Sequence, residues 1–436
     1  MSQNVPKGSL KRSTIATTAA AKVGFKQLTH LSKRPFLSVE KRSQHKQETN
    51  TANAKTIFNA LSQLRGTALK VAQMLSMETE MLPKQYQQEL SKSYHQVPPL
   101  NRALMRKVIS QELGASPETL FASFESQAFA AASLGQVHAA TTKDNQPLAI
   151  KIQYPGIDLT IHSDIQLVKK LISPLQDSKS LIGILEEIES RMKEETNYQY
   201  EADNLRWFAN NITANNIIIP KVYEQWSSQH VLSMQRLEGL HLQAWLATNP
   251  SQTQRNRAAQ TIYDLYIHTV FELQRFHADP NPGNYLFRED GNIGLVDFGC
   301  IKQLTPVFSR NLSTLYQSIN ANDMATLFKT YKKLGMIKDE ADEEFSEVYF
   351  ETILQPFFTW VTKPFKHESF DFSQHKNYAR ESLNLVEKIR KYKGKHHGSI
   401  ELNNNFVFTD RTLYGLYKIF EQLGATVQMR NRWTCK

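Results

Sequence analysis

Three polar residues in the second half of the chain have the types and spacing needed to hold a divalent cation and to accept a proton. The segment "FHADPNPGN" places Asp279 five residues before Asn284, and "VDFG" places Asp297 thirteen residues beyond Asn284. Asparagine and aspartate supply hard oxygen ligands that suit Mg²⁺. A carboxylate within reach of a hydroxyl group can orient it or accept its proton. We therefore predict Asn284 and Asp297 as metal ligands and Asp279 as the catalytic carboxylate.

A lysine upstream can supply the positive charge that a phosphate chain requires. The segment "LAIKI" places Lys151 in a predicted strand, sixteen residues after Gly135. In protein kinases such a lysine grips the α- and β-phosphates, and the catalytic loop H-R-D-x-x-x-x-N has the spacing seen here from Asp279 to Asn284. Asp-Phe-Gly or Ala-Ile-Lys alone is weak evidence, because ordinary turns and strands contain both. The ordered set predicts one phosphoryl-transfer site that binds ATP and Mg²⁺.

The segment "AFAAASLGQVHAA", residues 128–140, has the form of a phosphate-binding loop in which alanine stands where glycine is usual. Glycine permits close backbone approach and positive φ, and each added methyl group hinders both. We therefore expect the phosphates to be held in an altered pose. Besides Lys151, the predicted nucleotide-binding residues are Ala130, Ala131, Ala132, Ser133, Gly135 and Val137.

Hydrophobic periodicity indicates the elements that must position these residues. Strand-like sequence from about residue 128 predicts a hairpin that turns at 143–146. Helices are predicted at about 52–76, 158–175, 180–210 and 252–276, with a strand pair formed by 217–228 and 230–239. The tail after residue 303 is predicted to be mostly helical, and its last helix is expected to begin at Asp410 as cap and to end at Gly424.

Composition narrows the classes of partner and compartment. The 436-residue chain has a net charge of +10, which suits phosphate or anionic lipid, and it carries no nucleic-acid-binding motif. Two cysteines, Cys300 and Cys435, are too few for a disulfide framework, so a reducing compartment is expected. No apolar run reaches the length of a membrane span.

The first 46 residues are basic, with Glu40 as the single acid. A flexible tail, a mitochondrial transit peptide and a lipid-facing arm all fit this composition.

Taken together, the motifs resemble the UbiB-like atypical kinase family, also called AarF or ADCK proteins, over roughly residues 55–425. The alanine-rich nucleotide loop of the family corresponds to "AAASLGQVH", and its histidine-alanine-aspartate loop corresponds to "HADPNPGN". The family's K-x-G-Q helix appears as "KVAQ", and its E-x-D motif with the following helix glutamate appears as "ETNYQYEA". The resemblance implies an α+β, bilobal protein-kinase-like fold with an N-terminal helical extension and a helical C-terminal region.

The resemblance also implies roles for residues in these two motifs. Glu201 is expected to pair with Lys151 and to join the catalytic set, although charged helices are usually solvent faces. Lys70 and Gln73 are expected to project toward the active site and to restrict substrate entry, with Glu195 positioning their helix or a second metal. Helical geometry places Lys70 and Gln73 opposite the apolar stripe, as a solvated polar face would also do.

Two positions depart from the family pattern. Ala72 replaces the glycine of K-x-G-Q, and Asn197 replaces the aspartate of E-x-D. The first change alters how closely that helix can approach a nucleotide. The second removes a carboxylate, so Asn197 is not predicted as a metal ligand.

The expected domain organisation has four parts: a basic flexible arm (1–50), a helical extension (51–120), an N-lobe (121–240) and a C-lobe (241–436).

The resemblance implies an ATP-dependent kinase or ATPase in ubiquinone or other isoprenoid-lipid metabolism. Because no Ala-Pro-Glu follows Asp297, protein phosphorylation is the less favoured activity. A nucleotide-gated scaffold without catalysis and an aminoglycoside-kinase-like enzyme are the alternatives. A cytoplasmic protein, peripheral membrane contact and a mitochondrial precursor all remain open, as do the phosphoryl acceptor and the oligomeric state.

Overall fold

The computed structural model describes residues 9–64, 66–77, 84–92, 102–132, 134–175, 178–337, 343–375, 378, 381 and 403–429. The chain divides into two compact units. The first unit comprises Met1–Glu201 and Val222–Arg236, and the second comprises Ala202–Lys221 and Leu237–Lys436. Within the described ranges, no helix combines the length and the apolar character that crossing a membrane requires.

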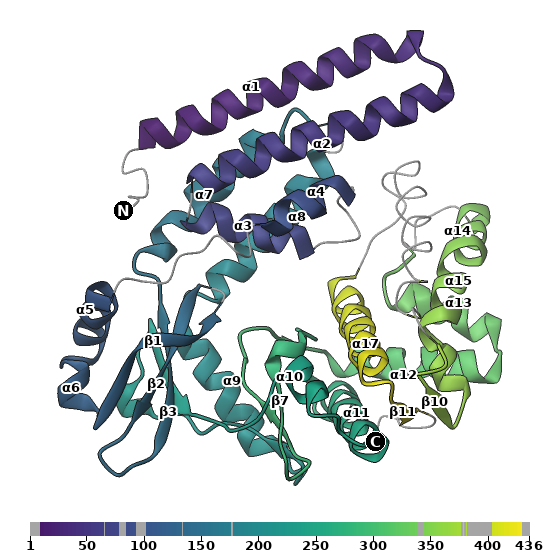
Figure 1. Cartoon of the computed structure of the whole chain (residues 1–436). Helices are drawn as coiled ribbons and strands as arrows, with labels where there is room; N and C mark the ends of the chain where they lie inside the picture. Colours follow the sequence, from purple (N-terminus) through teal and green to yellow (C-terminus); the bar gives the residue numbers. More distant parts are fainter. Residues whose placement is uncertain are drawn as a thin grey trace. The chain divides into compact units, whose positions relative to one another are not determined.

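The first unit contains a bundle of helices and an antiparallel sheet (Figure 1). Its helices are α1 (Ser9–Lys33), α2 (Val39–Leu64), α3 (Gly66–Met77), α4 (Lys84–Leu90), α5 (Arg102–Leu113), α6 (Pro117–Leu120), α7 (Ile157–Ile172), α8 (Ser178–Glu194) and the start of α9 (Tyr198–Asn211). Its strands are β1 (Ser123–Ala132), β2 (Gly135–Thr141), β3 (Pro147–Gln153) and β5 (Val231–Gln235), in the spatial order β1-β2-β3-β5.

Strand alternation gives β3 two different faces. Leu148, Ile150 and Ile152 belong to a hydrophobic cluster that includes Met105, Val108 and Ile109 of α5. Because successive side chains of a strand point to opposite faces, Lys151 lies on the face away from α5. The predicted β2–β3 hairpin is confirmed, with Thr141 opposite Pro147 on either side of the turn.

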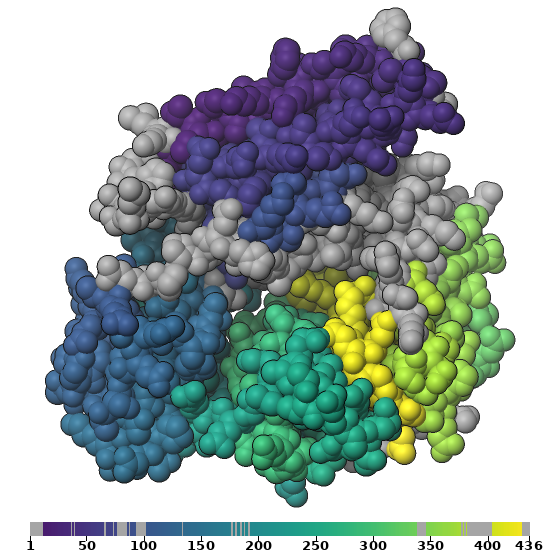
Figure 2. All heavy atoms as spheres, viewed as in Figure 1, coloured from purple at the N-terminus to yellow at the C-terminus, as the bar shows by residue number. Residues whose placement is uncertain are grey.

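The N-terminal segment is helical and packed, so the expected flexible arm is wrong for the described residues from Ser9 onward. Ala16, Ala19 and Val23 of α1 are buried in the cluster that also contains residues of α2, α3, α7 and α8. Figure 2 shows the atoms of α1 and α2 (purple) packed along one another. The small apolar stripe at i, i+3, i+7 spacing is hidden in a basic, Ser/Thr-rich composition, which is why composition alone predicts a tail.

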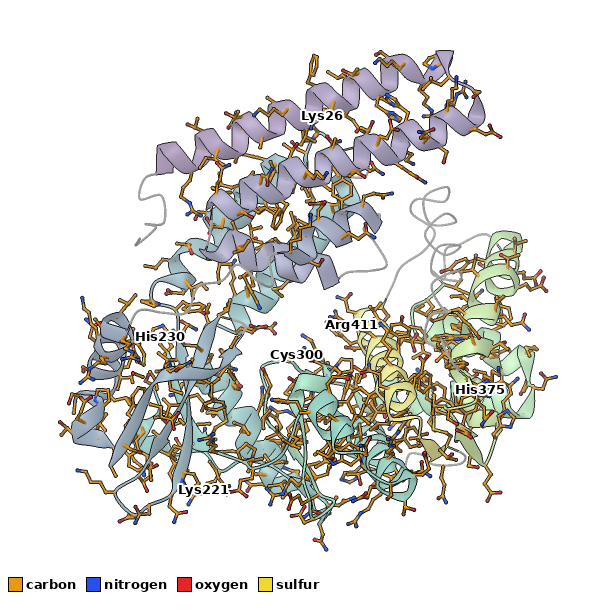
Figure 3. All side chains as sticks on the ribbon, in the orientation of Figure 1. Lys26, Lys221, His230, Cys300, His375 and Arg411 are labelled. Atoms are coloured by element: carbon orange, nitrogen blue, oxygen red, sulfur yellow. The ribbon has the colours of Figure 1, made fainter. Side chains whose placement is uncertain are left out.

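Polar side chains of α1 also bind the other helices. Lys26, labelled in Figure 3, donates from Nζ to the Ala52 carbonyl at 3.1 Å and to the Thr56 hydroxyl at 3.0 Å, both in α2. Arg12 forms an ion pair with the buried Asp164 of α7. Lys26 and Arg12, two of the basic residues of this segment, therefore have structural roles within the first unit.

The helix expected at 52–76 is confirmed over the described residues, in α2 and in α3; Arg65, between the two, lies outside the described residues. Asp164 accepts hydrogen bonds from Thr67 and from the Ala68 amide, so it supports the first turn of α3. The helix expected at 180–210 is α8 followed by α9, with the break at residues 195–197.

The second unit contains the remaining helices and three small sheets. Its helices are α10 (Leu242–Ala247), α11 (Gln252–Ile267), α12 (Pro306–Ala321), α13 (Met324–Lys333), α14 (Glu343–Tyr349), α15 (Gln355–Thr362) and α17 (Asn404–Leu423). Its strands are β4 (Ile217–Ile218), β6 (Arg275–His277), β7 (Tyr285–Phe287), β8 (Ile293–Leu295), β9 (Ile301–Gln303), β10 (Ser369–Asp371) and β11 (Thr426–Gln428), which form the sheets β4-β8-β7, β6-β9 and β10-β11.

The strand pair predicted from 217–228 and 230–239 is confirmed only around Val222 and Met234, and the regular strands of the two segments pair elsewhere. β4 pairs in parallel with β8, and β5 pairs with β3, so the two segments lie in different sheets. The two segments are joined by the antiparallel Val222–Met234 bridge and by backbone hydrogen bonds, such as that from the Tyr223 amide to the Ser233 carbonyl at 2.9 Å. The strand partners of both segments, β8 and β3, come from distant parts of the sequence, so local sequence does not reveal them.

The last helix, α17, begins six residues before the predicted cap. Asn403 is its N-cap, and the Asn403 side chain accepts a hydrogen bond from the Asn405 amide. Asp410 is a buried residue inside α17, not its cap. Gly424 ends the helix as predicted, with a φ of 56° that favours glycine.

Candidate functional site

Lys151 and Glu201 form a buried ion pair in the first unit. The Lys151 Nζ lies 2.8 Å from Oε1 and 2.6 Å from Oε2 of Glu201, and both side chains are less than a tenth exposed. Strand alternation presents Lys151 on the face away from α5, and Glu201 lies in the first turn of α9. Fifty residues separate the two, so neither local spacing nor periodicity could establish this contact. The sequence expectation for the pair came from the family motif, and the structure brings the two side chains together.

An aromatic ring that the sequence analysis overlooked lies beside this pair. The Lys151 Nζ is 5.0 Å from the ring centroid of Tyr198, which is buried and begins α9. A cation near an aromatic face is stabilised by the ring quadrupole, more so when water is excluded. Tyr198 lies three residues before Glu201, on the same side of the helix, and this spacing is the signal that could have identified it.

The start of α9 shows the structural role of Asn197, one of the two departures from the family pattern. The Asn197 side chain accepts a hydrogen bond from the Gln199 amide at 3.0 Å, so Asn197 caps the helix that carries Glu201. Gln153 of β3 donates to the carbonyl of Thr196 at 2.9 Å and to the carbonyl of Glu195 at 3.4 Å. Position 197 therefore serves local structure with an uncharged side chain, and Gln153 ties the segment to the strand of Lys151.

The described part of the alanine-rich segment is formed by strands β1 and β2, so the loop predicted from Ala130 to Val137 is wrong for the residues of these strands. Ala130, Ala131 and Ala132 belong to β1 and pair with Val137, Gln136 and Gly135 of β2. None of the three alanines has a positive φ. Alanine is therefore compatible with the backbone, because the strand conformation does not require glycine. Ser133 lies outside the described residues.

The register places most of the predicted nucleotide residues on one face of the sheet. Val137 is directly opposite Lys151, and Ala130 is directly opposite Val137, so these three share a face. Ala132 and Gly135 are two residues along in the same alternation. Ala131 lies in the opposite alternation, level with Ile152 of the α5 face, so the structure separates it from the others.

Gly135 is required for close packing. A Cβ built on Gly135 would overlap the Ile152 carbonyl oxygen and would lie 2.9 Å from the Tyr198 hydroxyl. A side chain at this position would push β2 away from β3 and from α9. Close packing against Ile152 and Tyr198 thus accounts for the glycine at this position.

The predicted gating residues are only partly described. Lys70 is half-buried in α3, and the backbone of Gln73 lies in the same helix, whereas the Gln73 side chain lies outside the described residues. Glu195 is half-buried between α8 and α9. Their gating role stays a prediction.

In the second unit, His277 connects the catalytic loop to Asp-Phe-Gly. The Asp279 amide donates to His277 Nδ1 at 3.3 Å, so the ring proton lies on Nε2, which donates to the Asp297 carbonyl. β7 follows Asn284, and β8 precedes Asp297. The two strands pair antiparallel, and the Val296 amide donates to the Asn284 carbonyl at 3.1 Å. The hairpin therefore brings two sequence-predicted segments together.

The donor set of this segment fits Mg²⁺. The Asn284 Nδ2 donates to the Asp279 carbonyl at 3.1 Å and to Asp279 Oδ2 at 2.9 Å, which turns the Asn284 amide oxygen away from Asp279. The Asp297 Oδ1 accepts from the Gly299 amide at 2.9 Å. An amide oxygen and a carboxylate suit a cation that takes its remaining ligands from water and phosphate.

Helix α17 supports the catalytic loop through a glycine that the sequence analysis did not single out. A Cβ built on Gly415 would overlap the ring of Pro280, which lies between Asp279 and Asn284. The absence of a side chain at Gly415 lets the loop rest on the helix. No spacing rule predicts this contact, because 135 residues separate Gly415 from Pro280.

Gly415→Ala should therefore displace the catalytic loop. Overpacking at such a contact costs about 1–3 kcal/mol of stability, and a shifted Pro280 moves Asp279. We expect a lower unfolding temperature together with slower ATP turnover. Gly183→Ala in α8 is the control, because a Cβ there meets nothing within 4 Å; it should leave turnover unchanged. Equal behaviour of the two variants would contradict the proposed packing constraint.

Comparisons with known proteins identify the family to which the chain belongs. The family model described as "ABC1 atypical kinase-like domain" matches residues 92–331. The chain is 30% identical over 309 residues to "Atypical kinase COQ8B, mitochondrial" of Danio rerio, covering 70% of this chain and 49% of that protein. It is 30% identical over 345 residues to "Probable protein kinase UbiB" of Shewanella piezotolerans, covering 76% of this chain and 61% of that protein. The chain thus spans about half of the first relative and about three fifths of the second.

A solved structure, the complex of Rv3197 with erythromycin from Mycobacterium tuberculosis, has a TM-score of 0.59 to this chain at 24% identity. The match covers 89% of this chain and 96% of the solved chain. At this level of identity the likeness concerns the fold alone.

Proposed function

The chain belongs to the ABC1 atypical kinase-like family, and from this premise we propose that it binds Mg-ATP and transfers the γ-phosphoryl group to an acceptor hydroxyl or to water. The observation that supports the proposal best is the buried Lys151–Glu201 ion pair. Two charges held in the interior are costly unless they are well paired. A lysine oriented by a helix glutamate is also the group that protein kinases use to bind the α- and β-phosphates.

The remaining residues have roles that follow from their chemistry. Asn284 and Asp297 would hold Mg²⁺, which neutralises phosphate charge when it is bound. Asp279 orients the acceptor hydroxyl and accepts its proton as the new P–O bond forms and ADP leaves. His277 fixes the backbone between Asp279 and Asp297 and does not itself exchange protons with substrate. Ala130, Ala132, Gly135 and Val137 line the sheet face that Lys151 shares.

We propose a small molecule as acceptor, in ubiquinone or other isoprenoid-lipid metabolism, with peripheral contact to anionic or isoprenoid lipid. The absence of Ala-Pro-Glu after Asp297 supports this over a protein acceptor. A second candidate is a nucleotide-gated scaffold for lipid-modifying enzymes. Asn197 favours it, because an uncharged helix cap stands where the family pattern has a carboxylate.

Asp297→Asn tests the proposed Mg-ATP site. The amide oxygen can still accept from the Gly299 amide, but the charge that holds the cation is lost. We expect the Mg²⁺-dependent gain in ATP affinity to fall by at least about tenfold, or 1.4 kcal/mol, in nucleotide titrations with and without Mg²⁺. Asp290→Asn is the matched control, since Asp290 is an exposed residue that interacts with Arg288 and Asn292. An unchanged Mg²⁺ dependence in Asp297→Asn would overturn the assignment.

A further inference from the structure

Asn204 in α9 binds two segments of the second unit with opposite ends of its amide group. The Asn204 Nδ2 donates to the Phe298 carbonyl at 3.0 Å, and Asn204 Oδ1 accepts from the Arg275 guanidinium at 2.5 Å. Arg275 begins β6, two residues before His277, and Phe298 directly follows Asp297. One side chain therefore connects the strand that leads into the catalytic loop with the Asp-Phe-Gly segment.

Arg275, whose guanidinium donates to Asn204, is itself held in place by Trp207. Its guanidinium lies 4.6 Å from the ring centroid of Trp207, also in α9, which fixes the plane of the donor group. Burial lowers the pKa of Arg275, and nearby Asp203 opposes that effect. The side chain nevertheless stays protonated at neutral pH, because arginine titrates far above it. A charged donor strengthens and orients the Asn204 amide.

Phe298 is fixed on both sides of its backbone. Its ring is fully buried, 5.2 Å from the ring of Phe208 and 5.8 Å from that of His277, edge-on in both cases. His277 donates to the Asp297 carbonyl, and Asn204 donates to the next carbonyl along, that of Phe298. Two consecutive peptide planes are thereby anchored. The first plane contains the Asp297 Cα, and the second plane, joined to the first at the Phe298 Cα, limits how far the first can move, so both anchors act on the position of Asp297.

We propose that Asn204 is a positioning residue for Asp297: through its bond to the Phe298 carbonyl it holds the Asp-Phe-Gly segment in the conformation that presents the Asp297 carboxylate to the metal. The inference rests on the proposed function for its consequence in Mg²⁺ binding. The hold on the segment itself can be measured without nucleotide. Asn204 contacts none of the proposed catalytic or metal-binding side chains, and it belongs to none of the motifs named in the sequence analysis.

Cys300 provides the nucleotide-free measurement. It lies two residues after Phe298, is partly exposed, and its carbonyl accepts from the Ala278 amide at 2.9 Å (labelled in Figure 3). A looser segment should expose this thiol more often. In the full chain with Cys435→Ser, the rate at which iodoacetamide alkylates Cys300 therefore reports the position of the segment.

Asn204→Asp is the discriminating variant. It keeps the shape and still accepts from Arg275, but its carboxylate cannot donate to the Phe298 carbonyl. We expect Cys300 alkylation without nucleotide to accelerate about fivefold, the scale of one lost hydrogen bond. The Mg²⁺ concentration for half-maximal stimulation of ATP binding should rise by a similar factor, with ATP affinity in the absence of Mg²⁺ unchanged. Asn210→Asp, the same replacement at an exposed position of α9, should change neither quantity.

The outcomes separate this inference from the proposed function. If the wild-type chain binds no Mg-ATP, the proposed function fails, and the Cys300 rate still decides whether Asn204 holds the segment. If Asn204→Asp leaves the Cys300 rate at the wild-type value, the inference is overturned whatever the nucleotide results. Asn204→Ala, which buries no new charge, replaces the Asp variant should the latter not fold, and the same two results apply to it. Thermal unfolding, recorded in parallel, excludes global loosening as the cause of a faster rate.

Discussion

Lys151→Met should lower ATP affinity and turnover more than any other single replacement in the first unit. Methionine keeps the length and packing of the stem but removes the cation that the phosphates require. The change also leaves Glu201 as a buried carboxylate without its partner, and breaking a buried ion pair in this way costs about 3–5 kcal/mol. We expect turnover to fall at least about a hundredfold, the scale of a lost electrostatic group at a transition state.

Stability and function can be separated by a second replacement. Lys151→Met combined with Glu201→Met removes both charges, and an apolar pair of similar volume is often as stable as the ion pair. The double variant should therefore regain most of the unfolding temperature without regaining ATP binding. Lys193→Met, at an exposed lysine paired with Glu189, is the control for loss of a surface charge. Wild-type ATP affinity in the double variant would exclude Lys151 as a phosphate-binding residue.

The sequence predicts best the elements that are determined by local alternation of apolar and polar residues or by a helix-ending residue. The β2–β3 hairpin follows from period-two alternation around a polar turn, and it alone determines the face that Lys151 shares with Val137. Gly424 ends α17 because glycine tolerates the left-handed conformation there. The α+β, kinase-like fold is confirmed by the family match and by the solved structure.

The elements that the sequence predicts poorly depend on partners distant in the chain. Helix α1 reads as a basic tail because its small buried stripe gives a weak hydrophobic signal, and packing against α2 and α7 decides its state. Asp410 resembles a cap, yet the N-cap Asn403 lies earlier, so α17 is about two turns longer than expected. The β4 and β5 segments pair with strands that composition does not identify.

The candidate site also contains residues that the sequence predicts and residues that only the fold reveals. The proposed catalytic and metal-binding residues Asp279, Asn284 and Asp297 can be recognised in the sequence because chemistry sets their types and spacing. Residues that position them cannot, because any small or polar residue can serve if the fold brings it to the right place. Gly415 and Asn204 act on segments 135 and 94 residues away, and neither position carries a motif of its own.

Asp279→Asn should distinguish an enzyme from a nucleotide-gated scaffold. Asparagine has the shape of aspartate, and its amide oxygen can still accept from the Asn284 Nδ2 that Asp279 Oδ2 now binds at 2.9 Å. The loop should therefore keep its structure, and nucleotide affinity should stay within about twofold of wild type, below half a kcal/mol. Without a carboxylate to accept the acceptor's proton, turnover should fall by about a hundredfold to ten-thousandfold.

The cellular counterpart is a deletion strain rescued by the wild type or by Asp279→Asn, with its quinones and other isoprenoid lipids profiled. If the protein is an enzyme, the variant binds nucleotide normally, accumulates to the same level and leaves the deletion profile uncorrected. If the variant restores the wild-type profile with its turnover lost, phosphoryl transfer is dispensable and the scaffold function replaces the one proposed here. The result is informative because, in the proposed mechanism, Asp279 acts on the acceptor's proton through its charge alone, whereas the roles proposed for Lys151 and Asp297 include nucleotide binding.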